Sequence, residues 1–286
     1  MTAAVPARAG LGGAAGTALL LAPALLVLAA AFVAPLLRLA ALSVSAPGGV
    51  FAAYAEILSD TVYWIVMRNT LVLALVVTVI TLMLGFALAL TLTRLGGGWR
   101  LMLFAAVMLP LWISVLVRTF SWMLLLERNG PINRVVMGLG LVNEPLPLLF
   151  NFAGVTIGMV HVLLPYAVLP IHTALARIDP ALLKASEGLG APAMMTFRRV
   201  LLPLAARGVA TAAAFVFLLS LTFFVTPALL GGPSTTTIPM LIDSYVNERL
   251  AWPLAGAASM LLLAMVLAFV ALVARVVPLG GLVAAR

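Results

Sequence analysis

Long runs of apolar residues dominate the chain, and short segments between them carry most of the polar and charged positions. A helix that crosses the hydrocarbon core of a membrane needs about 20 apolar residues, and each run reaches that length. The pattern therefore predicts six membrane spans, the third of which contains Pro110 and Arg118. The predicted ranges are 14–44, 70–92, 101–126, 152–175, 204–230 and 252–277.

The first apolar run is longer than the roughly 7–15 residues of a signal-peptide core. We therefore predict an uncleaved first span, interrupted by Pro23 and Pro35. The segment that follows, residues 45–68, is polar and contains a short amphipathic piece at 51–58. Two longer polar loops are predicted further along the chain, at 127–151 and 231–249.

The composition indicates an all-α, polytopic membrane protein. Of the 286 residues, 65% are hydrophobic and 8% are charged, whereas soluble domains have about 25% charged residues. Lys and Arg number 16 against 8 acidic residues. Because no basic run is interleaved with aromatic residues, we interpret this excess as a topology signal and expect no nucleic-acid partner. The chain contains no cysteine, which excludes a disulfide framework and a cysteine metal site.

The charges also orient the predicted spans. With six spans both chain ends lie on one side, and cytoplasmic segments carry the excess of Lys and Arg. If the ends are cytosolic, ten basic residues lie inside: Arg8, Arg94, Arg100, Arg177, Lys184, Arg198, Arg199, Arg207, Arg275 and Arg286. Five lie outside: Arg38, Arg68, Arg128, Arg134 and Arg249. The acidic residues are skewed the other way, so we predict that both termini are cytosolic.

Residues 179–204 form the one structured, charged segment between two predicted spans. Asp179 is a suitable N-cap and Pro180 suits the first helical position, so a short helix is predicted to begin there. Gly188 and Gly190 allow that helix to end and the chain to turn.

A second short helix is predicted after this turn. It carries Met194, Phe197 and Leu201 at helical spacing, and Pro203 marks the re-entry into the membrane. The two helices together predict a compact helix–turn–helix in the cytosol. Its apolar face would be available to a partner there.

The residue types do not favour an enzyme. The two histidines, His161 and His172, are eleven positions apart on one predicted helix, which separates them by about 16 Å, so they cannot share a metal. A phosphate-binding loop needs a lysine after a glycine-rich turn, and the one lysine, Lys184, stands in a different setting. We expect no catalytic residue, metal site or nucleotide site in this chain, so any ATP hydrolysis would belong to another polypeptide.

Arg118 lies inside the third predicted span, nine residues before Glu127. Arginine at the centre of a helix costs about 2.5–3.5 kcal/mol on insertion scales, and each Leu, Ile, Phe or Val returns about 0.3–0.6 kcal/mol. About ten apolar neighbours therefore allow insertion, with the charge facing the bundle interior or a water-filled path. Two interpretations are open. The residue lines or gates a path, or it snorkels to the interface or forms a structural ion pair.

Thr226 and Pro227 predict a break near the outer end of the fifth span. Proline frees backbone carbonyls, which are tolerated at membrane depth only when they line a cavity or are buried in protein. The position suits an outer gate, and an ordinary helix end is the alternative. Trp122, Phe223 and Phe224 would suit a cation–π surface for an ammonium group, or they pack as interface anchors.

The segment after Asp179 resembles the coupling loop of binding-protein-dependent ABC importer permeases, whose pattern is roughly E-A-A-x-x-L-G-A followed by F-x-x-V-x-L-P. The matching positions are Lys184, Ala185, Ser186, Leu189, Gly190, Ala191, Phe197, Val200, Leu202 and Pro203. The usual acidic first residue is Lys184 here, and Glu187 lies one turn on, where it would substitute in part. The resemblance implies that this loop contacts a separate ATPase subunit.

Three further stretches resemble the permeases of spermidine/putrescine-type importers: 109–133, 146–180 and 223–233. The resemblance implies the all-helical fold of type I, MetI-like permeases. It divides the chain into an N-terminal span with a periplasmic loop (1–68), a five-helix core (69–277) with a cytosolic coupling loop (176–203), and a cytosolic tail (278–286).

By this resemblance, the chain is expected to form the translocation path of an ATP-driven importer in the bacterial inner membrane. The expected partners are a second permease, two ATPase subunits that hold ATP and Mg²⁺, a periplasmic solute-binding protein, a small cationic solute and membrane lipid. A polyamine is the first expectation for the solute, with an amino-acid derivative, an opine, an aminophosphonate or ferric iron as alternatives. A secondary transporter is disfavoured because no Asp or Glu falls within a predicted span.

Overall fold

The structure, a computed structural model, describes residues 14–276, and its regular elements are all helices. They are α1 (Ala14–Ser43), α2 (Ala52–Ser59), α3 (Thr61–Arg94), α4 (Gly97–Met108), η1 (Leu109–Trp112), α5 (Val115–Leu126), α6 (Pro131–Gly138), α7 (Phe152–Ala176), α8 (Pro180–Gly188), α9 (Ala193–Thr196), η2 (Phe197–Leu201), α10 (Leu202–Thr222), α11 (Val225–Leu230), η3 (Pro233–Thr235), α12 (Ile238–Asn247) and α13 (Trp252–Val276). Arg8, Arg286 and the predicted tail 278–286 lie outside the described residues.

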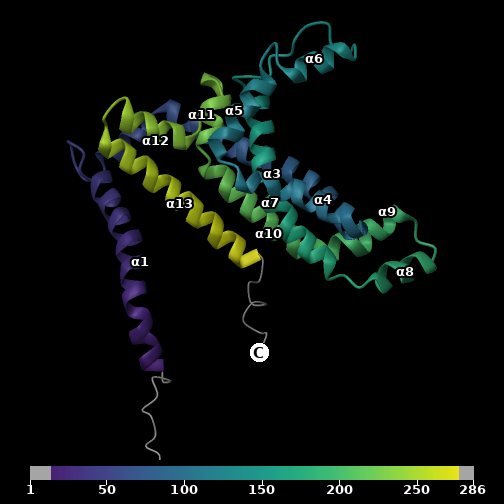
Figure 1. Cartoon of the computed structure of the whole chain (residues 1–286). Helices are drawn as coiled ribbons and strands as arrows, with labels where there is room; N and C mark the ends of the chain where they lie inside the picture. The colour runs from purple at the N-terminus through teal and green to yellow at the C-terminus, as the bar shows by residue number, and fades with distance from the viewer. Residues whose placement is uncertain (1–13, 277–286) are drawn as a thin grey trace, which may run out of the picture.

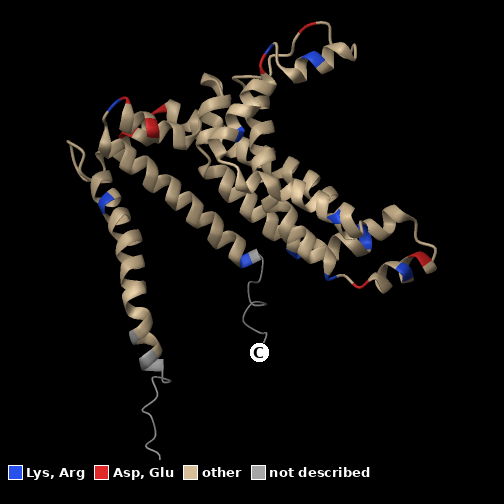
Figure 2. Cartoon of the chain, in the orientation of Figure 1, with Lys and Arg blue, Asp and Glu red and all other residues tan. Residues whose placement is uncertain are grey.

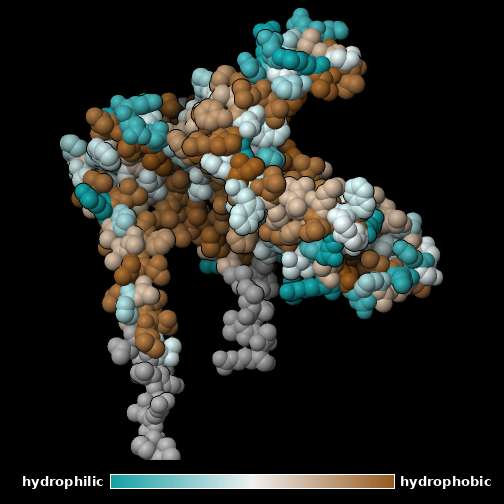
Figure 3. All heavy atoms as spheres, in the orientation of Figure 1, coloured by the Kyte–Doolittle hydropathy of each residue, from teal (hydrophilic) through white to brown (hydrophobic). Residues whose placement is uncertain are grey.

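Five of the described helices are long and apolar enough to cross a membrane, or six when a sharply bent pair counts as one span. α6 and α12 lie at one end of the bundle, and α8 and α9 lie at the other (Figure 1). The charged residues gather at these two ends (Figure 2), and apolar side chains cover much of the surface between them (Figure 3). This distribution is the one expected of a helical bundle that spans a bilayer.

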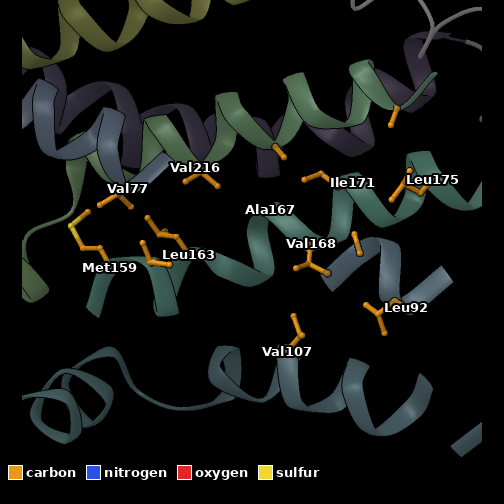
Figure 4. Packing of buried hydrophobic residues seen from close by; sticks show 14 of the residues in the cluster. Val77, Leu92, Val107, Met159, Leu163, Ala167, Val168, Ile171, Leu175 and Val216 are labelled. Carbon is orange, nitrogen blue, oxygen red and sulfur yellow. The ribbon is translucent and has the colours of Figure 1, made fainter. Parts of the chain in front are cut away.

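α7 is the centre of the bundle and packs along α3 and α10. Leu163 of α7 belongs to the buried cluster shown in Figure 4, together with Val77 of α3 and Val216 of α10. Small residues allow the helix backbones to approach, since a Cβ added to Gly85 of α3 would lie 2.8 Å from the Cβ of Ala167. Lipid gives no hydrophobic drive for helices to associate, so close packing of this kind stabilises the core.

α1 stands apart from this core and contacts α13 (Figure 1). The contact is close near the end of α1, where a Cβ added to Gly256 of α13 would lie 2.8 Å from the backbone nitrogen of Ser43. Pro23 and Pro35 lie within one continuous helix, so the predicted interruptions of the first span are wrong. A spanning helix tolerates proline when local adjustments satisfy the freed backbone groups.

The third predicted span, 101–126, is not a single helix. The segments on either side of Ile113 and Ser114 are bent by 107° relative to each other. Pro110 explains the end of α4, because proline has no N–H to donate and its ring crowds the carbonyl four residues earlier, and the chain tightens into the 3₁₀ turn η1. Arg118 therefore belongs to α5, the segment that follows the bend.

The segments 45–68 and 231–249, predicted as polar loops, are more helical than the polar pattern predicts. The short helix predicted at 51–58 is present as α2, and α3 begins directly after it at Thr61 instead of at residue 70. Asp60 starts α3 by accepting a hydrogen bond from the backbone N–H of Val62 at 2.8 Å. α12 is fixed to α3 by the backbone N–H of Ile238, which donates to Thr70 Oγ1 at 2.9 Å.

Candidate functional site

The first candidate site is the arm made by α8 and α9. As predicted, Asp179 caps α8 by accepting from the backbone N–H of Ala181 at 2.8 Å, and Pro180 is its first residue. The helix ends at Gly188, and Gly190 adopts a positive φ of 78°, a conformation that glycine takes without steric strain. The residues that begin and end this helix could therefore be predicted from the sequence.

The second half of the arm differs from the prediction. α9, η2 and α10 form one helix that runs from Ala193 to Thr222, so Pro203 does not separate a short helix from the fifth span. The widened turn η2 explains this continuity, because the N–H of Leu202 bonds to the carbonyl of Phe197, five residues earlier. Such a π turn adjusts the backbone directly before Pro203, which cannot donate a hydrogen bond of its own.

The arm presents apolar side chains to its surroundings. α8 contains no buried residue, and the side chain of Leu189 is 88% exposed. Among the residues that match the coupling-loop pattern, or that accompany it, the exposed ones are Lys184, Ala185, Glu187, Leu189, Gly190, Leu202 and Pro203, and the half-buried ones are Ser186, Ala191, Phe197 and Val200. Met194, expected to share a face with Phe197 and Leu201, is 62% exposed, whereas Leu201 is buried.

Two contacts connect the arm internally and to the bundle. Ser186 Oγ lies 2.9 Å from Thr196 Oγ1, which links α8 to α9. The ring of Phe197 packs edge-on against Phe86 of α3, with 5.6 Å between ring centroids. A cleft of about 370 Å³ separates α8 from the ends of α3 and α7, with Glu187 in its lining. α8 is thus held at its ends and open along its length.

The second candidate site lies where α5, α7 and α11 meet. Trp122 Nε1 of α5 donates to His161 Nδ1 of α7 at 3.0 Å, and the two rings meet edge to face. Arg118 is four residues before Trp122, so both side chains leave the same face of α5. Arg118 is also close enough to His161 and Tyr166 of α7 for electrostatic interaction.

The guanidinium of Arg118 faces protein. Its Nε and Nη1 atoms are buried, and within residues 14–276 neither has a hydrogen-bond acceptor. No Asp or Glu occurs in the described parts of α1, α3, α4, α5, α7, α10, α11 or α13. Arg118 consequently forms no ion pair within the part of the chain that the structure describes.

The break in the fifth span lies at Phe223 and Phe224, earlier than the predicted break at Thr226 and Pro227. Pro227 accounts for the shift, because in a continued helix its ring would clash with the carbonyl of Phe223, four residues before it. Within α11 Pro227 sits in the first turn, where a missing N–H is harmless.

α11 is packed tightly against the bundle. Thr226 and Pro227 are buried, and Thr226 Oγ1 lies 3.2 Å from Thr119 Oγ1 of α5. A Cβ added to Gly158 of α7 would lie 2.9 Å from Thr226 Cγ2. Phe223 packs against the core and Phe224 is 38% exposed, so these two aromatic side chains point into different surroundings.

Sequence reasoning missed three residues of this site: Thr119, His161 and Tyr166. The spacing of the two histidines excludes a shared metal, but it identifies no partner for His161. The sequence contained one indication of a partner for Trp122, because an indole N–H is a donor that needs an acceptor when it is buried. Nothing in the linear pattern identifies which acceptor it finds, because the two residues are 39 positions apart.

The chain is similar in sequence to curated transport proteins. It is 32% identical over 210 residues to the spermidine/putrescine transport system permease protein PotB of Salmonella typhimurium, covering 73% of this chain and 72% of PotB. It is 35% identical over 225 residues to the inner membrane ABC transporter permease protein YdcU of Escherichia coli, covering 73% and 71%. The chain belongs to the ABC importer permeases. No family model matches it.

Solved structures of ABC importers share its fold. A bacterial alginate ABC transporter in complex with alginate pentasaccharide-bound periplasmic protein has a TM-score of 0.77 at 18% identity, covering 91% of this chain and 92% of the other. The MetNI methionine ABC transporter has a TM-score of 0.57 at 19% identity, covering 77% and 98%. The predicted MetI-like permease fold is confirmed, and as an ABC importer permease the chain is a transport subunit and not an enzyme.

Proposed function

We propose that this ABC importer permease carries polyamines across the bacterial inner membrane by alternating access. Its similarity to PotB, which is named for spermidine and putrescine, supports the solute class. The name of YdcU supports the inner membrane as the location. Trp122, Phe223 and Phe224 are aromatic side chains of the kind that attract ammonium groups, with Trp122 and Phe223 packed against the core and Phe224 partly exposed. Thr226 and Pro227 follow Phe224 in the sequence and form the proposed outer gate.

The observation that carries the transport mechanism is the exposed arm of α8 and α9. An arm with an apolar residue such as Leu189 exposed at its tip is suited to insertion into a partner protein. We assign that partner to a separate ATPase subunit, which holds ATP and Mg²⁺, contacted by Lys184, Ala185, Ser186, Glu187, Leu189, Gly190, Ala191 and Phe197. ATP-driven closure of two such subunits would move the arm and, through it, α10.

The remaining partners follow from the same assignment. A second permease completes the path, and a periplasmic solute-binding protein delivers the solute, as in the alginate transporter complex that shares this fold. The excess of Lys and Arg on the side of α8 supports a cytosolic arm and cytosolic chain termini.

Substitution of Leu189 by Arg tests the role of the arm. A charge placed in an apolar interface is expected to weaken binding by about 2 kcal/mol or more, which is over tenfold. Tagged Leu189→Arg should therefore retain at least about tenfold less ATPase on an affinity resin, and putrescine uptake should fall in parallel.

Leu139→Arg is the matched control, because Leu139 is 69% exposed and follows α6 at the opposite end of the bundle. It should leave ATPase retention and uptake unchanged. Equal retention of the ATPase by the Leu189→Arg and Leu139→Arg variants would refute the proposed contact.

One observation favours a second class of solute. Arg118 has no ion-pair partner among residues 14–276, and its positive charge would repel a polyamine and attract a carboxylate. An amino-acid derivative or an opine carries both an ammonium and a carboxylate.

A further inference from the structure

The hydrogen bond between Trp122 and His161 determines what His161 offers to its surroundings. An indole N–H can only donate, so Nδ1 of His161 must be the acceptor of the 3.0 Å bond. A neutral imidazole with an unprotonated Nδ1 carries its proton on Nε2. Trp122 therefore fixes His161 as a donor through Nε2, on the helix that faces Arg118.

Arg118 adds further donors to the same place. A guanidinium has no acceptor atom, and its Nε and Nη1 are buried with no acceptor among the described residues. The hydroxyl of Tyr166 lies within electrostatic range on α7. The junction of α5, α7 and α11 thus gathers N–H groups and one positive charge, with no carboxylate on any described part of the spans to balance them.

We infer that Arg118 and His161 form a binding site for a carboxylate at the junction of α5, α7 and α11. The planar guanidinium binds a carboxylate through two parallel hydrogen bonds, a stronger interaction than a neutral hydrogen bond. The neutral imidazole contributes a third donor without adding charge. Trp122 acts as a positioning residue, because its hydrogen bond fixes the tautomer and the ring orientation of His161.

The carboxylate can come from two sources. It belongs to the transported solute, or it is an Asp or Glu side chain of a second permease that packs against this junction. The proposal rests on the proposed function for its partner and for the choice of probes. A polyamine has no carboxylate, so polyamine transport requires the second source.

The experiment uses the purified complex of this chain, the second permease and the ATPases in detergent. Thermal unfolding is measured with putrescine and with 4-aminobutyrate, which has the same four-carbon chain with a carboxylate in place of one ammonium. The variants are Arg118→Met, which removes the charge, and Arg118→Lys, which keeps it. Arg128→Met is the matched control, because Arg128 is exposed just after α5.

A solute carboxylate predicts that 4-aminobutyrate, and not putrescine, raises the unfolding temperature of the wild-type complex. Stabilisation by a ligand at 100 times its Kd corresponds to about a hundredfold shift in the folding equilibrium. The shift should vanish in Arg118→Met and persist in part in Arg118→Lys. Trp122→Phe should weaken it, because His161 then loses its fixed tautomer.

A partner carboxylate predicts that neither compound changes the unfolding temperature. In that case the amount of second permease that co-purifies with the tagged chain should be at least about tenfold lower for Arg118→Met than for the wild type. Arg118→Lys should give an intermediate amount, and Arg128→Met should give the wild-type amount. The inference is overturned if Arg118→Met matches Arg128→Met in both measurements and neither compound stabilises the wild-type complex. Failure of the proposed function is distinct, since it would appear as absent putrescine uptake by the complete importer.

Discussion

α7 and α1 are both apolar helices of spanning length, yet their surroundings are opposite. In α7, 61% of the most apolar 18-residue stretch is buried, whereas in α1 none of the corresponding stretch is buried by the described chain. α1 is the more apolar of the two. Apolarity therefore indicates that a helix enters the membrane, but it does not indicate whether protein or another surface covers it.

Small residues on the neighbouring helices distinguish the two cases. Gly85 of α3 and Gly208 of α10 both lie against α7, and a Cβ at either position would meet atoms of α7. Around α1 the comparable close approach is at Gly256 of α13, near the end of the helix.

Substitution of Gly208 by Leu should disrupt the packed region most. A Cβ at this position would lie 2.8 Å from the backbone carbonyl oxygen of Pro170, an atom that cannot move without displacing α7. Overpacking costs about 1–3 kcal/mol and occasionally more. Because the Cβ alone already clashes with backbone, we expect Gly208→Leu to exceed this range, and most of the monodisperse protein should be lost in size-exclusion chromatography. Ala29→Leu on exposed α1 should have no effect, and equal yields from the two variants would contradict the contrast.

Truncation of a buried leucine should have an intermediate effect. Leu163 of α7 is fully buried, and Leu→Ala changes in protein cores cost about 2–5 kcal/mol. We expect the lower end of this range, because lipid solvates the unfolded helix. Leu26→Ala on α1, where Leu26 is 69% exposed, should leave the unfolding temperature in detergent unchanged. A similar decrease for both variants would show that α1 is as well packed as α7.

Removal of a hydroxyl from the packed region should have the smallest effect. Thr226→Val loses the 3.2 Å contact with Thr119 and keeps the shape of the side chain. Hydrogen bonds between membrane helices average about 0.6 kcal/mol, so the unfolding temperature should decrease slightly. Thr173→Val is the control, because exposed Thr173 bonds only within α7. If Thr226→Val lowered the unfolding temperature as much as Leu163→Ala does, the contact between Thr226 and Thr119 would stabilise the bundle as much as the packing of a buried leucine.

Local chemistry made much of the fold predictable. Asp179, Pro180 and Gly190 start and end the helix α8 through their own capping and backbone preferences, so a short stretch of sequence suffices to locate them. Pro110 marks the end of α4, but the 107° bend lies at Ile113 and Ser114, and neither of these residues disfavours a helix strongly, so the position and the size of the bend could not be predicted locally. The continuity of α9 with α10 was likewise hidden, because a π turn absorbs Pro203.

The candidate site was predictable only in part. Arg118 and Trp122 stand out in the sequence because a charge and a polar ring are unusual at membrane depth. Their relation to His161 depends on how α5 packs against α7 after the bend, which no local pattern encodes. The pairing of Thr119 with Thr226, 107 positions apart, is hidden for the same reason.

The uninterrupted helix from Ala193 to Thr222 has a mechanical consequence. Its 30 residues form a helix about 45 Å long that ends at the break before α11. No loop interrupts the helix between Ala193 and Thr222, so a displacement of its first turn is passed along the helix toward the break at Phe223. α8 is joined to that first turn through the bend at Gly190 and through the 2.9 Å contact between Ser186 Oγ and Thr196 Oγ1, so a partner that moves α8 also moves the start of the long helix.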